Sequence, residues 1–120
     1  MKNLPAIRER FLQENTQMKL GHLASDLARI ASLLNMQAGE KALQNVMEET
    51  KFFAEWTAPD TDPETQAFLL EIRSLITEKE LEWDSLSNDE NWRDETAKCL
   101  RNLSNKLLKK AGFEIDDRQI

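Results

Sequence analysis

The sequence predicts an all-α protein, an antiparallel up-and-down four-helix bundle. Residues with high helix propensity (Leu, Glu, Lys, Ala, Gln and Arg) dominate the chain, whereas Gly and Pro occur only 3 times each. Apolar residues repeat at helical spacing along most of the chain. Turn-forming residues gather at a few places, and connections of a few residues require neighbouring helices to run antiparallel.

The first expected helix begins near Leu4, because Asn3 is a suitable N-cap and Pro5 is tolerated in a first turn. Its pattern ends near Gln37, with Gly39 as the stop. The helix is therefore long, and one apolar stripe should run along it if it is straight.

The apolar residues of this helix do not form one stripe. At 100° per residue, its first half places Leu4, Ile7, Phe11 and Met18 almost opposite the second-half residues Leu20, Leu27 and Leu34. Two explanations fit this pattern. Either the chain is broken near Asn15-Thr16, with Thr16 as a new N-cap, or one continuous helix packs its first half against a different partner.

The second expected helix runs from Glu40 to Trp56 and ends before Pro59, because the residue before a proline is disfavoured in helical geometry. Its inner face consists of Leu43, Val46, Met47, Thr50 and Phe53.

The third and fourth expected helices each begin at a capping-box pattern. Thr61–Glu64 starts the third, which should end between Trp83 and Ser85, and Ser87–Glu90 starts the fourth, which should end at Gly112. Residues 1–113 are expected to form a single domain, and residues 114–120 a frayed tail.

Charge and composition disfavour several partners. The net charge is −6, which argues against nucleic acid and against anionic membrane surfaces. The chain lacks a run of about 20 apolar residues and an apolar signal segment at its start, so we expect a cytoplasmic protein. The acidic stretch Glu78–Glu95 leaves open a surface that occupies a partner's basic face.

Several large apolar residues exceed what one bundle needs to bury. Phe52 lies nearly opposite the inner face of its helix, and Trp56 lies to one side. The N-terminal segment could fold back over them, a homodimer could cover them, or they could form a groove for another protein's helix. The candidate interface residues are Ile7, Phe11, Met18, Phe52 and Trp56.

Few residues suggest catalysis. His22, the single histidine, falls on the polar side of its helix, and nucleophile-plus-base chemistry needs a base near the nucleophile. Cys99 lies at the edge of an apolar stripe and is expected to be a small buried residue. We therefore predict no catalytic residue, no cofactor and no bound metal.

A magnesium-dependent all-helical phosphohydrolase is the alternative. Enzymes of that kind carry Glu-Glu-x-x-Glu on one helix and Glu-x-x-Asp on the next, and Glu48 and Glu49 begin such a pattern. Phe52 stands where the third acid belongs, and Glu80 and Asp84 are four residues apart rather than three. The sequence therefore favours a non-enzymatic protein that self-associates or docks a protein partner.

Two stretches carry a family resemblance. Leu23–Leu34 (LASDLARIASLL) and Glu48–Asp60 (EETKFFAEWTAPD) resemble a family of small all-helical proteins of cyanobacteria. The resemblance implies a bacterial, cytoplasmic protein. It implies no activity and no catalytic residue.

Overall fold

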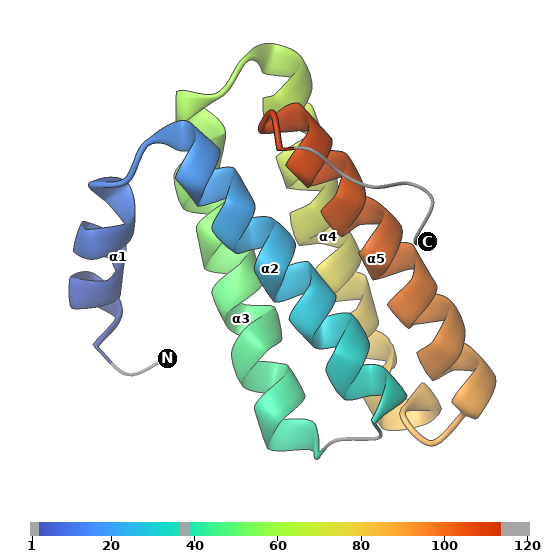
Figure 1. Cartoon of the computed structure of the whole chain (residues 1–120). Helices are drawn as coiled ribbons and strands as arrows, with labels where there is room; N and C mark the ends of the chain where they lie inside the picture. Colours follow the sequence, from blue (N-terminus) through green and yellow to red (C-terminus); the bar gives the residue numbers. More distant parts are fainter. Residues whose placement is uncertain (1–2, 37–38, 114–120) are drawn as a thin grey trace.

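The computed structural model describes residues 3–36 and 39–113, and these residues form helices without any strand. The elements in chain order are α1 (Leu4–Leu12), α2 (Thr16–Asn35), α3 (Glu40–Thr57), the 3₁₀ turn η1 (Ala58–Asp60), α4 (Pro63–Leu86) and α5 (Glu90–Lys110) (Figure 1). The all-α prediction is confirmed. The described chain has five α-helices rather than the expected four, because the first expected helix is broken.

The break lies at Gln13–Asn15, where the sequence left two possibilities open. Asn15 has an extended backbone (φ −73°, ψ 166°), and its side chain accepts a hydrogen bond of 2.8 Å from the Met18 N–H. Asn15 is therefore the N-cap of α2, and Thr16, the expected cap, is the first residue of that helix. The two opposed apolar stripes thus belong to two separate helices.

Aspartates cap α4 and α5 one or two positions beyond the expected caps. Asp62 accepts from the Thr65 N–H at 3.4 Å, and Asp89 accepts from the Trp92 N–H at 3.1 Å. Thr61 instead donates its hydroxyl to the Ala58 carbonyl at 2.8 Å. The serine expected to cap α5, Ser87, has helical dihedral angles because it closes the C-terminal end of α4.

Two further helix-end predictions are wrong. Asn3 has a left-handed backbone (φ 55°), and its side chain makes no capping hydrogen bond to α1. Helix α2 ends at Asn35, and Gly39 is the N-cap of α3 with an ordinary φ of −63°. Gly112 does have the positive φ, 89°, that a glycine stop requires. The predicted tail at 114–120 lies outside the described residues.

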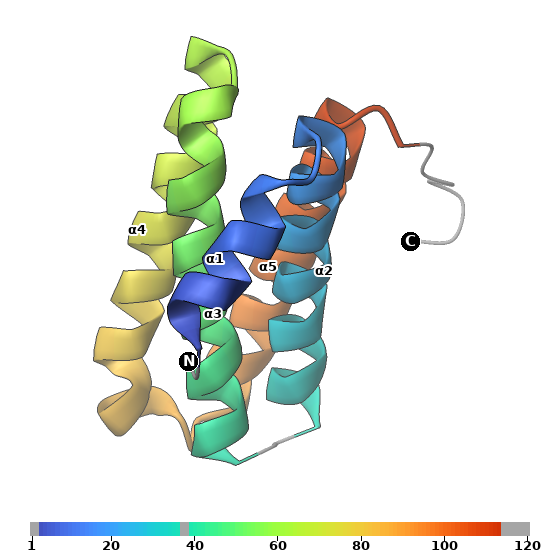
Figure 2. The same cartoon turned by 90° about the vertical axis from the view of Figure 1, so that its left-hand side faces the viewer.

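The four longer helices alternate in direction and pack in two pairs (Figures 1 and 2). Helix α2 packs on α5, α3 packs on α4, and α2 against α3 joins the pairs, whereas α4 barely touches α5. The largest fully buried side chains are Leu23, Leu27, Ile30, Leu34, Leu43, Met47, Leu69, Ile72, Ile76, Leu100 and Leu107. None of the helices in the described ranges combines the length and apolarity that crossing a bilayer demands.

Small residues line the contact between α2 and α5, which we call the α2–α5 seam: Ala24, Ala31, Ala97 and Ser104, all buried. The Ser104 hydroxyl donates to the Ala24 carbonyl at 2.8 Å. At the end of the seam, Arg93 donates to the Leu34 carbonyl at 2.9 Å. Small side chains allow the two backbones to approach, and these bonds set the antiparallel register.

Helix α1 lies apart from the two pairs and crosses the outer face of α3 (Figures 1 and 2). Phe11 is its one buried residue. A helix of 9 residues is too short to be stable alone, so α1 depends on what it covers.

Candidate functional site

The surface beneath α1 is aromatic. The Phe11 ring stacks on Phe53 with centroids 4.2 Å apart and lies 5.9 Å from the Trp56 ring, while Phe52 stacks on Trp56 at 5.4 Å. We call Phe11, Phe52, Phe53 and Trp56 the aromatic cluster. The Arg8 guanidinium lies 6.0 Å from the Trp56 ring centroid, which is within reach of a cation–π contact.

The structure brings three of the five predicted interface residues into this cluster. Phe11 is 4% exposed, whereas Phe52 and Trp56 stay half-buried although α1 lies over α3. Ile7 packs beside them, and Met18 lies outside the cluster with 45% of its surface exposed. The fold-back of the N-terminal segment is thus present within one chain, and it leaves two large aromatic side chains partly in contact with solvent.

Two surface grooves run alongside α1, and Ile7 and Glu49 line both. The first, about 350 Å³, is lined by Ile7, Arg10, Phe11, Glu14, His22, Glu49 and Phe53. The second, about 620 Å³, is lined by Ile7, Arg29, Lys41, Ala42, Asn45, Val46 and Glu49. Helix α1 therefore covers this face of α3 incompletely.

Glu49 of α3, which lines both grooves and is half-buried, pairs with the buried Asp26 of α2. Asp26 is 8% exposed. Burial, followed by the hydrogen bond to Glu49 and its negative charge, raises the pKa of Asp26 from 3.8 to about 8, and Arg29 acts in the opposite direction. With a pKa of about 8, the Asp26 carboxyl is mostly protonated at neutral pH.

The smaller of the two grooves also contains an acid that contacts the histidine. Glu14, in the break between α1 and α2, lies 2.6 Å from His22 Nε2. The His22 ring is also 6.3 Å from the Phe11 ring. His22 is exposed, as expected for the polar side of its helix, and it ties the break to the first turns of α2.

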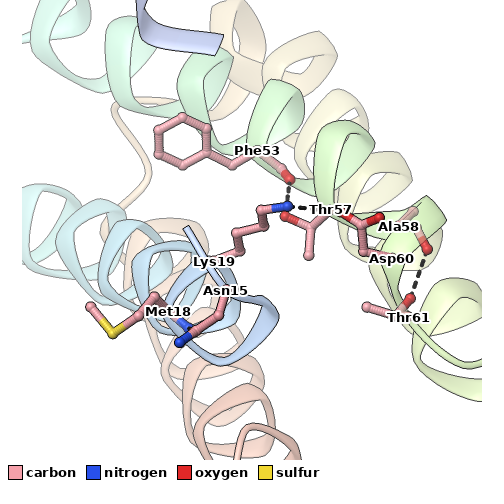
Figure 3. Close-up of polar contacts among 8 residues, drawn as sticks. All are labelled: Asn15, Met18, Lys19, Phe53, Thr57, Ala58, Asp60 and Thr61. Carbon is pink, nitrogen blue, oxygen red and sulfur yellow. Dashed lines mark hydrogen bonds and ion pairs between the residues drawn. The ribbon is translucent and has the colours of Figure 1, made fainter. Parts of the chain in front are cut away.

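Sequence reasoning missed a buried lysine that joins α2 to the end of α3 (Figure 3). Lys19 is 4% exposed and pairs with Asp60 of η1 at 2.7 Å, beside Thr57, whose hydroxyl donates to the Phe53 carbonyl at 2.7 Å. Lys19 and Asp26 are seven residues apart, on the same flank of α2 as Leu23 and Ile30. This spacing could have indicated from the sequence that both charged side chains face the interior.

The acids proposed for the magnesium alternative lie on different sides of α3. Glu48 lines a pocket of about 230 Å³ with Lys51, Glu80 and Trp83, whereas Glu49 faces the grooves beside α1. Adjacent helical residues point about 100° apart, which separates them. Over residues 3–36 and 39–113, no group of three or more His, Cys, Asp or Glu residues could hold a metal ion.

The prediction for Cys99 is wrong. The thiol is exposed, because Cys99 precedes the fully buried Leu100 by one residue and so points about 100° away from the core. Two leucines of α4 also point away from the core, since Leu70 and Leu81 are 51% and 80% exposed.

The chain was also compared with known proteins. No protein-family model, no curated protein and no solved structure matches it. The resemblance of Leu23–Leu34 and Glu48–Asp60 to a cyanobacterial family therefore stays a prediction, and the function has to be argued from the aromatic cluster and its surroundings.

Proposed function

We propose that this protein is a non-enzymatic interaction protein that associates with a second copy of itself through α1 and the aromatic cluster. In this proposal α2 to α5 serve as an antiparallel four-helix bundle that holds α3 rigid beneath the contact. The observation that carries the proposal is the half-burial of Phe52 and Trp56 on a face that α1 already covers in part.

Side-chain chemistry supports this surface over the rest of the described chain. Phe and Trp each bury about 150–250 Å² when fully covered, and Trp and Arg are enriched among the residues that dominate binding energies. Trp56 and Arg8 contact each other here. Arg10 of α1 and Glu49 of α3 line the same groove, so this face carries charges of both signs.

The test is the mass of the protein in solution. Light scattering across a concentration series should give a dimer for the natural sequence. Phe52→Glu with Trp56→Glu should give a monomer whose circular dichroism keeps the natural helix content, because neither side chain belongs to the fully buried core.

The matched control replaces two exposed apolar residues of α4. Leu70→Glu with Leu81→Glu adds the same charge at residues that are 51% and 80% exposed, and this variant should keep the mass of the natural protein. A natural protein that is monomeric at every concentration would reject self-association. A dimer that persists in the Phe52/Trp56 variant would reject the aromatic cluster as the interface.

A further inference from the structure

Three residues, Gln13–Asn15, separate α1 from α2, and the backbone of Asn15 is extended. Gln13 already has helical dihedral angles (φ −76°, ψ −15°), and the φ of Asn15, −73°, also suits a helix. The ψ of Asn15, 166°, belongs to extended backbone, and it turns the chain at the start of α2. The Asn15 side chain holds this turn through its hydrogen bond to the Met18 N–H.

A helical Asn15 would bring α1 into line with α2 and change what α1 faces. In one continuous helix Ile7, Phe11 and Met18 share a side, at spacings of four and seven residues. That side lies almost opposite Leu20 and Leu27, which are buried in the core. Phe11 would then point away from its own chain, and Phe53 and Trp56 would lose their cover.

From this geometry we propose that two copies of the chain exchange α1, so that each α1 lies on the aromatic cluster of the other copy. The inference rests on the proposed function and names its contact. The exchange is closed and two-fold, because each copy gives one α1 and accepts one.

The surface of α3 beneath α1 favours a second copy of the chain as the partner. This surface already binds α1 of its own chain. The Phe11 contacts with Phe53 at 4.2 Å and Trp56 at 5.9 Å can therefore form unchanged between two chains. Exchange therefore needs no new complementarity. It also accounts for Met18, which is 45% exposed within one chain and joins Ile7 and Phe11 on one stripe when the helix is continuous.

The first test shifts the equilibrium at the hinge. Asn15→Leu removes the acceptor for the Met18 N–H and favours helix through the break. An N-cap contributes about 1 kcal/mol and a dimer contains two hinges, so the dissociation constant of the dimer should fall about tenfold or more. Asn102→Leu, at an exposed position of α5, is the matched control and should leave the constant unchanged.

The second test is complementation between two defective chains. Phe11→Ser damages α1 and leaves the receiving surface intact, while Trp56→Ser damages that surface and leaves α1 intact. Each variant alone loses this contact equally in its closed monomer and in its exchanged dimer, so its dissociation constant should stay close to that of the natural chain. A mixture should form the heterodimer preferentially, because the intact α1 of one chain fits the intact α3 of the other, and native mass spectrometry separates the three dimers by mass.

The outcomes separate this inference from the proposed function. Preferential heterodimers support exchange, and a statistical mixture overturns it. If the natural dimer is lost in the Phe52→Glu/Trp56→Glu variant while complementation fails, exchange is wrong and the cluster remains the interface. If neither the natural chain nor Asn15→Leu dimerises, both the exchange of α1 and the proposed self-association are wrong. Ile7→Ser, a milder lesion on α1, replaces Phe11→Ser if circular dichroism shows that Phe11→Ser has lost its fold.

Discussion

The packing of α2 against α5 differs in its side chains from the packing of α3 against α1. On the side of α5, the α2–α5 seam is made of small buried residues, with Ala31 and Ala97 fully buried and Ser104 bonded to the Ala24 carbonyl. On the side of α1, the contact consists of large aromatic rings, two of them half-buried, and it lies beside the pair of buried Asp26 and half-buried Glu49. The seam fixes the fold, whereas the α1 side leaves apolar surface and titratable groups available.

This difference indicates where the molecule can change without unfolding. Close packing makes the seam sensitive to volume, since every neighbouring atom is already in contact. Helix α1 contributes one buried side chain, Phe11, and three residues connect it to α2. Undocking of α1 from α3 would therefore leave the main core intact. The following predictions measure the contrast between the two sides.

The largest effect should come from the core beside the seam. Leu27 is fully buried in α2, and Leu27→Ala should lower the free energy of unfolding by about 2–5 kcal/mol, because it removes apolar burial and leaves a cavity. Urea unfolding followed by circular dichroism measures the loss. Leu81→Ala, at a residue that is 80% exposed, should change stability by less than about 0.5 kcal/mol. Similar losses for both variants would contradict the described core.

A smaller effect is expected from the side of α1. Phe11→Ala removes the stack on Phe53, but the loss cannot exceed the free energy that docks α1, so we expect about 1–2 kcal/mol. Hydrogen exchange should then show the amides of α1 losing protection while those of α2 and α5 keep theirs. A loss as large as that of Leu27→Ala, with protection lost throughout, would mean that α1 belongs to the cooperative core.

Much of the helical layout could be predicted from the sequence, because it depends on local signals. The periodicity of Leu20, Leu27 and Leu34 predicted the buried stripe of α2, and the opposed stripe of Ile7 and Phe11 predicted that the chain either breaks near residue 15 or finds another partner. The choice between the two depended on tertiary contacts with α3, which periodicity does not contain.

The polar parts of the site were harder to predict. Lys19 and Asp26 look like surface residues by type, and charged residues are rarely buried without a partner. Their partners, Asp60 and Glu49, come from other helices, so only the fold brings the pairs together. The caps were missed for a different, local reason. Asp62 and Asp89 cap their helices in place of the expected Thr61 and Ser87, because competing local hydrogen bonds decide among neighbouring cap candidates.

The smallest effect at acidic pH, and the most specific, should come from Asp26→Asn. The amide stands in for the protonated carboxyl, so near pH 4 stability should change by about 1 kcal/mol or less. The variant removes a titration, however. In the folded protein the pKa of Asp26 is about 8, against an ordinary value of 3.8, so folding takes up a proton between these values.

The sign of the pH effect follows from that proton. Where the folded state binds more protons than the unfolded state, the free energy of unfolding falls as pH rises. The stability of the natural protein should therefore fall from about pH 4 to about pH 8, relative to Asp26→Asn, and the difference should level off above pH 8. Asp84→Asn, at an exposed residue of α4, is the control and should follow the natural curve. If the Asp26→Asn curve ran parallel to the natural one across this range, Asp26 would be ionised in the folded protein, and the α1 side would lack the proton on Asp26 that distinguishes it from the seam.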